Sequence, residues 1–198
     1  MERLYSKVKL GKHMINKNAD FELLATAAKF IQNDFTESNE AWRDSPFEWV
    51  LHLPTGSKGS LGKRLVKQWC ALKELAVDRS PDSEADMLIN GHRVEIKFST
   101  LWKAGIYKFQ QLRDQNYEYS ILLGISPFEA HCWVVSKALL KKYVIGHMGQ
   151  HTGSAGQETA WLTVKPNNPP AWLAECGGSL DEAYTALKSL RITQIRNS

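Results

Sequence analysis

Cysteine is scarce in this chain, and long apolar runs are absent. The 198 residues include three cysteines, an odd number with no Cys-x-x-Cys pair. That usage excludes a disulfide scaffold, argues against structural zinc and is typical of reduced thiols in a cytoplasm, the compartment we expect. No stretch reaches the 18 apolar residues of a membrane-spanning helix. The basic start has no apolar signal-peptide core either, so we expect no membrane association.

Nucleotide-binding motifs are also missing. The chain has no Gly-x-x-x-x-Gly-Lys-Ser/Thr pattern, which excludes a P-loop ATPase or helicase. A hydrophobic content of 43% with seven tryptophans is instead enough for a folded core. The length suits one domain over residues 1–198. Within it we expect a helical N-terminal part (1–56), a core (57–145), and a loop with a C-terminal helix (146–198).

Positive charge is concentrated in two segments. The net charge is only +4, yet residues 57–73 and 97–113 carry lysines and arginines and no acid. These residues are Lys58, Lys63, Arg64, Lys67 and Lys73, then Lys97, Lys103, Lys108 and Arg113. Residues 20–48 are acidic by contrast. Basic stretches of this kind suit a polyanionic partner, although any single lysine is also at home on a solvated helix face.

The segment EADMLINGHRVEIKF gives the strongest structural signal. Asn90 and Gly91 predict a type I′ turn, because both central residues of that turn need positive φ. A two-residue turn there places Asp86 opposite Glu95 on the paired strand. Lys97 follows two residues later, and side chains alternate along a strand, so it points to the same side.

The two faces of this hairpin differ in character. One carries apolar side chains ready for a core, namely Ala85, Met87, Ile89, Val94, Ile96 and Phe98. The other carries three carboxylates and one ammonium, from Glu84, Asp86, Glu95 and Lys97. Clustered carboxylates are costly without a cation, and Mg²⁺ prefers oxygen ligands and keeps waters beside a phosphate substrate. We therefore predict a divalent-metal site; the simple alternative is a solvated face with a Glu84–Lys97 ion pair.

The pattern Asp86-x8-Glu95-x-Lys97 resembles that of the PD-(D/E)xK nucleases, which have the restriction-endonuclease-like fold. The resemblance implies an α/β fold in which helices flank a mixed central β-sheet that contains the catalytic hairpin. It also implies that Asp86 and Glu95 bind Mg²⁺, with Mn²⁺ able to substitute, and that the backbone carbonyl of Ile96 is a further ligand. Lys97 completes the implied catalytic set.

Two acids remain open in this assignment. Pro81-Asp82 is a literal Pro-Asp, so Asp82 is a rival first acid. Asp86 is preferred, because the turn places it opposite Glu95. The family often adds an acid from an upstream helix, which makes Glu48 a candidate third ligand.

The resemblance implies a Mg²⁺-dependent endodeoxyribonuclease that leaves 5′-phosphate and 3′-hydroxyl ends. Without ATPase motifs, the role we expect is that of a sequence-specific type II restriction endonuclease acting on double-stranded DNA. One alternative is a structure-specific repair, recombination or phage-type nuclease of the same fold; another is a non-catalytic DNA-binding module. A homodimer would cut both strands, and a monomer would nick them in turn. The DNA contacts we expect are Lys58, Lys63, Ser99, Thr100, Lys103, Lys108 and Gln111.

Hydrophobic spacing predicts the remaining elements. Helices are expected at 20–35, 45–53 and 61–75, with a Gly/Ser-rich loop at 54–60 and a helical or partly helical segment at 101–118. The inward side of the helix at 61–75 is expected to be Leu61, Leu65, Val66, Trp69, Leu72 and Leu75. Strands are expected at 119–126 and 130–136, then a Gly-rich loop at 146–160, an irregular connector at 166–173, and a final helix opened by a Ser179–Glu182 capping box.

Histidine and tryptophan are two further side-chain types that could bind a ligand. His147 and His151 are four residues apart, but the surrounding glycines argue against a helical metal site. Trp102, Trp133 and Trp161 are expected to anchor the core or an interface.

Overall fold

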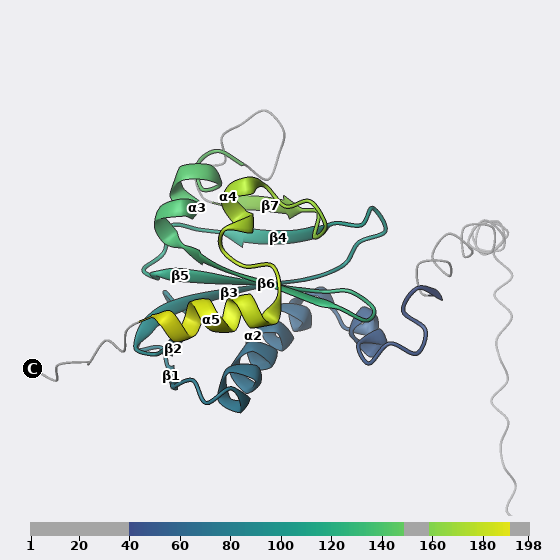
Figure 1. The fold of residues 1–198 in the computed structure, drawn as a ribbon, viewed down its shortest axis with the longest axis horizontal. Coiled ribbons are helices and arrows are strands. Elements are labelled where there is room, and N and C mark those ends of the chain that lie inside the picture. The colour runs from purple at the N-terminus through teal and green to yellow at the C-terminus, as the bar shows by residue number, and fades with distance from the viewer. Residues whose placement is uncertain (1–39, 149–158, 191–198) are drawn as a thin grey trace, which may run out of the picture. The chain divides into compact units, whose positions relative to one another are not determined.

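The computed structural model describes residues 40–148 and 159–190 (Figure 1). The expected helix at 20–35 and His151 lie outside these residues. The described elements, labelled as in Figure 1, are the 3₁₀ helix η1 (Glu48–His52), the helices α2 (Thr55–Leu72), α3 (Lys137–Tyr143), α4 (Ala171–Ala174) and α5 (Leu180–Ser189), and the strands β1 (Val77–Arg79), β2 (Met87–Ile89), β3 (His92–Thr100), β4 (Tyr107–Leu112), β5 (Tyr119–Ile125), β6 (Ala130–Ser136) and β7 (Ala160–Val164).

A five-stranded mixed sheet with the order β1-β2-β3-β5-β6 occupies the centre. β3 and β5 pair in parallel, and the other neighbours pair antiparallel. β4 and β7 form a separate two-stranded antiparallel sheet. The expected class, an α/β protein with a mixed central sheet flanked by helices, is confirmed.

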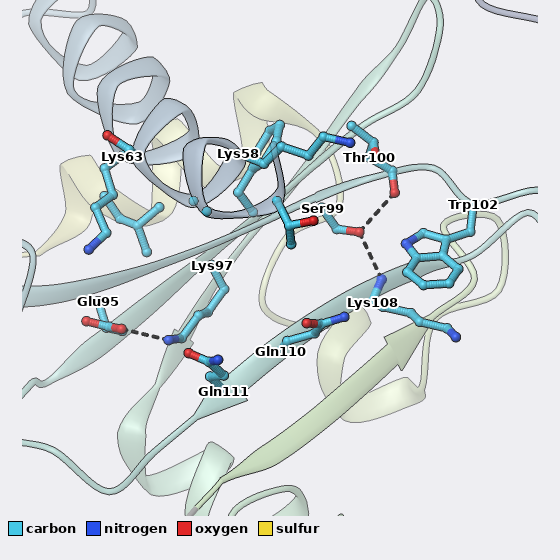
Figure 2. A pocket seen from close by; sticks show the side chains of 16 residues that line it. Lys58, Lys63, Glu95, Lys97, Ser99, Thr100, Trp102, Lys108, Gln110 and Gln111 are labelled. Carbon is cyan, nitrogen blue, oxygen red and sulfur yellow. Dashed lines mark hydrogen bonds and ion pairs between the residues drawn. The ribbon is translucent and has the colours of Figure 1, made fainter. Parts of the chain in front are cut away.

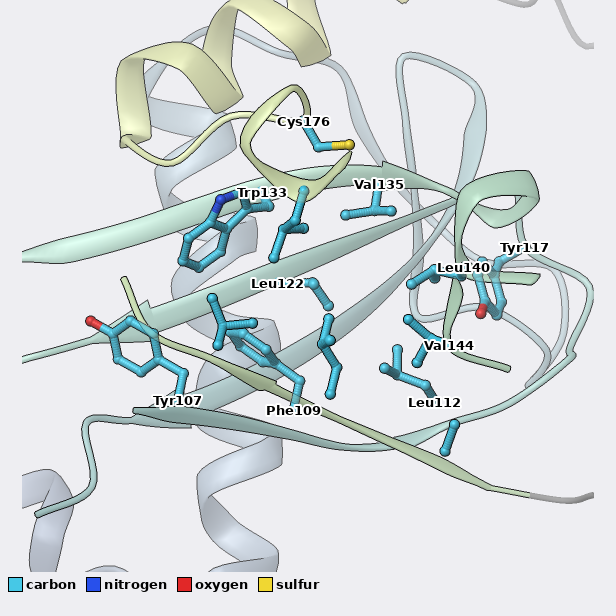
Figure 3. Close-up of a cluster of buried hydrophobic side chains, with 14 of the residues drawn as sticks. Tyr107, Phe109, Leu112, Tyr117, Leu122, Trp133, Val135, Leu140, Val144 and Cys176 are labelled. Carbon is cyan, nitrogen blue, oxygen red and sulfur yellow. The ribbon is translucent and has the colours of Figure 1, made fainter. Parts of the chain in front are cut away.

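Two layers cover the central sheet, one on each face (Figure 1). Helices α2 and α5 pack on one face, where they bury Val66, Cys70, Ala183 and Leu187 against the sheet. The β4–β7 sheet, α3 and α4 pack on the other face. Figure 3 shows this second cluster, in which Phe109 of β4 lies among Leu122 and Trp133 of the central sheet. Full burial of each large apolar side chain contributes about 1.5–3 kcal/mol, so the two layers hold β3 firmly between them.

The predicted hairpin forms around its predicted turn. Asn90 and Gly91 have φ of 52° and 84°, as a type I′ turn requires. Met87 pairs with Val94 and is the last residue of β2 away from the turn. Before Met87 the regular register ends, because the Asp86 N–H also donates to the Val94 carbonyl, at 2.9 Å. The prediction that Asp86 pairs with Glu95 across the two strands is therefore wrong.

This loss of register also moves a neighbouring side chain. Ala85 was expected beside Met87, but it packs in the cluster on the opposite face of the sheet. The other apolar predictions hold, since Met87, Ile89, Val94 and Ile96 are buried together under α2 and α5.

The turn is also tied to distant parts of the chain. The Asn90 side-chain amide donates to the Leu187 carbonyl in α5 at 3.0 Å. Its Oδ1 accepts from the Ala76 N–H at 3.3 Å, just before β1. A turn residue that also bonds two other segments fixes the hairpin against α5 and β1.

The expected helical segment at 101–118 is wrong. It contains β4, in which Tyr107, Phe109 and Leu112 are fully buried and Lys108 and Gln110 alternate with them. The alternation breaks at Gln111, where the register shifts and φ is 56°. Because of that bulge, the segment lacks the regular alternation of buried and exposed residues by which a strand is predicted from sequence.

Helix α2 begins earlier than expected. The residues 55–60 belong to its first turns instead of a loop, with Pro54 at the N-cap in extended conformation. Proline before a helix is compatible with its start, and helix context overrides the low propensity of glycine. Leu72, expected to face inward, is 83% exposed at the end of the helix.

The later predictions fare better. β5 and β6 coincide with the expected strands, and α5 opens with the Ser179–Glu182 capping box. The connector at 166–173 contains the start of the short helix α4. Trp133 is fully buried, as expected of a core anchor. No helix in the described parts of the chain is long and apolar enough to cross a membrane.

Candidate active site

Glu95 and Lys97 lie side by side on β3. The Lys97 ammonium is 2.8 Å from Glu95 Oε1, and both side chains are largely buried (Figure 2). Burial raises the pKa of Glu95 above its ordinary 4.5; Lys97 opposes that rise, and the charge of Asp86 adds to it. A carboxylate in this setting gains from any further positive charge placed beside it.

Asp86 reaches the same place from the segment before β2. Its Oδ2 accepts a hydrogen bond from the Ile96 N–H at 2.8 Å, and its Oδ1 forms an ion pair with Lys63 of α2. The side chain of Asp86 is largely buried, so these contacts fix its orientation. Asp86 therefore joins Glu95 through its side chain, although the two residues are not a strand pair.

Asp82 lies elsewhere. It forms an ion pair with Arg93, which holds the pKa of Asp82 below its usual range, and it is not buried. The Asp82 carboxylate also accepts from the Glu84 N–H at 2.9 Å. Of the two rivals, Asp86 is the acid whose charge acts on Glu95.

The other candidate acids do not join this pair. The Glu84 side chain accepts from the Asn116 N–H at 3.3 Å, and Lys97 pairs with Glu95 and not with Glu84, its partner in the simple alternative. Glu48 begins η1 and does not line the pocket that contains Glu95. Within residues 40–148 and 159–190, no three His, Cys, Asp or Glu side chains are grouped closely enough to hold a metal ion. The expected third ligand is therefore not found there.

Two carboxylates still make a donor set that Mg²⁺ accepts. Mg²⁺ is commonly held by one or two carboxylates and completes its shell with waters and substrate phosphate oxygens. Asp86 and Glu95 supply hard oxygen donors, and because burial raises the pKa of Glu95, a cation bound beside it would favour its charged form. The residues present therefore fit a magnesium ion, with the Ile96 carbonyl as the backbone ligand that the family resemblance implies.

A pocket of about 620 Å³ extends from Glu95 and Lys97 and lies between α2, β3 and β4. Of the expected DNA contacts, Lys103 is absent from its lining; those that line it are Lys58, Lys63, Ser99, Thr100, Lys108 and Gln111. Lys97 lines it as well, so ammonium groups from three elements face one space. Such a space attracts a polyanion.

Ser99 has a structural role that the sequence did not indicate. Its hydroxyl donates to the Thr100 carbonyl at 2.9 Å and accepts from the Lys108 N–H at 3.0 Å (Figure 2). The residue is buried, and its hydroxyl joins the end of β3 to β4. The expected contact of Ser99 with DNA stays a prediction, and in the structure its hydroxyl makes these two internal bonds.

The sequence did not predict several features of the pocket lining. Trp102, expected to anchor the core or an interface, lines the pocket and is 46% exposed. Gln110 also lines it, and the β4 bulge turns Gln111 toward Lys97 (Figure 2). Gly56 and Gly59 border the pocket, where the lack of a side chain leaves room along α2. The Gly/Ser-rich run beside lysines was the available signal for this last feature.

Comparison with known proteins gives little to set beside this geometry. No protein-family model matches the chain, and no curated protein matches it. One solved structure that matches is a bacterial homing endonuclease, at 14% sequence identity and a TM-score of 0.44, covering 68% of this chain and 91% of that one. The likeness is too low to place the chain in a family.

Proposed function

We propose that the chain is a Mg²⁺-dependent endonuclease that hydrolyses DNA phosphodiester bonds, as a member of the PD-(D/E)xK type. The observation that carries the proposal is that Glu95 and Lys97 pair at one end of a lysine-lined pocket, with the charge of Asp86 acting on Glu95 from behind the lining. Two acids and a lysine are a set suited to a cation and a phosphate, and the pocket supplies a path for a polyanionic strand.

The chain's own residues have distinct tasks in this reaction. Asp86 and Glu95 would hold Mg²⁺, which supplies Lewis-acid chemistry and lowers the pKa of water when bound. Lys97 places an ammonium where negative charge builds on the phosphate in the transition state. Water adds to phosphorus, the bond from phosphorus to O3′ breaks, and the products carry a 5′-phosphate and a 3′-hydroxyl. The Ile96 N–H keeps Asp86 in position throughout.

Plasmid cleavage tests the mechanism directly. Purified protein with Mg²⁺ should cut supercoiled plasmid, and excess EDTA should stop it. We expect Asp86→Asn, Glu95→Gln and Lys97→Met each to lower the cleavage rate by about 100-fold or more, because each removes a group that acts on the transition state. Cleavage that continues unchanged in EDTA would contradict the metal mechanism.

Asp82→Asn is the matched control for the choice of acid. Asp82 is an exposed aspartate of the same segment that pairs with Arg93. We expect this variant to cut at close to the wild-type rate. Loss of activity in Asp82→Asn with retention in Asp86→Asn would reverse the assignment.

The biological role we propose first is sequence-specific cleavage of double-stranded DNA as a type II restriction endonuclease. Discrete product bands from linear DNA support this role, and a smear of products contradicts it. The exposed Trp102 favours a second candidate, a structure-specific nuclease, for which activity is confined to branched or unpaired DNA. A plasmid that passes fully through the nicked form indicates a monomer, and direct linearisation indicates a homodimer.

A further inference from the structure

Trp102 lies at the opposite end of the pocket from Glu95 (Figure 2). The residue follows β3 and is 46% exposed, in a pocket otherwise lined largely by polar and charged side chains. A large aromatic ring left open inside a polar pocket is a contact surface for a ligand with an apolar face. The core does not use this tryptophan.

The backbone around Trp102 is held in place. Its N–H donates to the Ile106 carbonyl at 2.9 Å, and its carbonyl accepts from the Gly105 N–H at 2.8 Å. Gly105 has a φ of 67°, which closes this turn, and the Leu101 N–H donates to Ile125 of β5 at 2.8 Å. A ring on a fixed turn loses little conformational freedom when a ligand stacks on it.

Lys108 adds a charge to this ring. Its ammonium lies 3.9 Å from the centroid of the Trp102 ring, a cation–π contact that covers one face. Because Trp102 is 46% exposed, part of its ring stays open to a planar group, and the Lys108 ammonium can pair with an anion beside that group. A planar aromatic ring joined to a phosphate is the composition of a nucleotide, and base stacking on aromatic side chains is sequence-tolerant.

We propose that Trp102 and Lys108 form a subsite for an unstacked nucleobase and its adjoining phosphate. This inference rests on the proposed nuclease function and specifies its substrate: a base in an intact duplex is covered on both faces, so only an unpaired or extruded base offers one. From Glu95 to Thr100, β3 spans about 17 Å, since a strand rises about 3.3 Å per residue. Trp102 lies beyond that end of the strand, so the base lies several nucleotides from the cut.

The test scans an oligonucleotide with the fluorescent base 2-aminopurine, placed at one position at a time, and measures binding to the full chain in EDTA. Stacking on Trp102 should quench the probe at one position, and Trp102→Leu should abolish that quenching and weaken binding by about 5- to 100-fold. Trp102→Phe keeps an aromatic face and should bind within a few-fold of wild type. Trp49→Leu is the matched control, because Trp49 is 51% exposed but does not line the pocket.

The DNA forms tested separate two sources of the base. An effect of Trp102→Leu confined to single-stranded or mismatched DNA supports a base that is already unpaired. An effect on paired duplex, with quenching at one position, supports a base extruded on binding. Equal binding by Trp102→Leu and Trp49→Leu overturns the proposal, as does weaker binding with no position-specific quenching. Because cleavage is not the readout, failure here is distinct from failure of the nuclease proposal in the plasmid assay.

Discussion

Glu95 is buried among charged side chains, and its protonation state affects the free energy of unfolding. A carboxyl whose pKa is higher in the folded than in the unfolded state binds more protons when folded. The free energy of unfolding then falls as pH rises from about 4.5 toward the raised pKa of Glu95. The ionised Glu95 carboxylate therefore lowers the free energy of unfolding near neutral pH.

Glu95→Gln should remove this pH dependence, because glutamine does not ionise. We expect the stability difference between Glu95→Gln and wild type to move in favour of the variant as pH rises through that interval. Asp82, with its lowered pKa, gives the opposite slope, but it does so in both proteins and cancels. Urea unfolding in EDTA at stepped pH values measures the difference; one that stays constant across pH would contradict the raised pKa.

Mg²⁺ should act on the same residue. We expect the ion to raise the free energy of unfolding of the wild type, by about 2.7 kcal/mol at a concentration one hundred times its Kd. Glu95→Gln should lose most of this gain, whereas Asp82→Asn should keep it, since Asp82 lies with Arg93. Thermal unfolding with and without Mg²⁺ gives the answer, and equal shifts in all three proteins would remove Glu95 from the metal site.

At the level of elements, α2 approaches β3 closely at one point. Gly62 is buried against Phe98, and a Cβ at Gly62 would lie 2.3 Å from the Phe98 Cβ. Gly59, one turn earlier, has nothing within 4 Å of the same position. The two glycines of one helix therefore have different reasons to be glycine.

Alanine at these two positions should have opposite effects. Gly62→Ala overpacks the α2–β3 contact, and we expect a loss of about 1–3 kcal/mol in the free energy of unfolding. Gly59→Ala meets open space and gains helix propensity, so we expect a gain of about 0.5–1 kcal/mol. Urea unfolding of both variants measures these changes. A Gly62→Ala protein as stable as wild type would mean that Phe98 shifts without loss of stability.

The sequence predicted local features well and long-range ones poorly. The Asn90-Gly91 turn and the Ser179 cap each follow from the chemistry of adjacent residues. β4 could not be predicted in this way, because it pairs with β7 far along the chain. Its bulge also interrupts the alternation of buried and exposed side chains. In the site, Glu95 and Lys97 followed from strand alternation, whereas the pairing of Lys63 with Asp86 required the placement of a helix.

At the level of the whole molecule, positive charge from two segments of sequence meets on one pocket. Lys58 and Lys63 come from α2, and Lys97 and Lys108 come from β3 and β4. The modest net charge of +4 conceals this concentration. Binding of DNA should therefore depend steeply on salt, because each phosphate contact releases counterions.

Lys58→Ala should lower the salt dependence of duplex binding by about one unit of the slope of log K against log salt. Lys73→Ala is the control on the same helix, since Lys73 pairs with Asp181 at 3.6 Å and does not line the pocket. Fluorescence anisotropy in EDTA over a range of salt gives both slopes. Equal slopes for the two variants would mean that DNA does not run along the α2 side of the pocket.

The bond from the Asn90 side chain to the Leu187 carbonyl joins residues 97 positions apart. It fastens α5 to the hairpin that carries Glu95 and Lys97. Asn90→Gly would keep the turn but would remove the bond to the Leu187 carbonyl. Fraying at the end of α5 would then loosen the strands that carry Glu95 and Lys97, so that a change remote from the pocket alters the order of the candidate site.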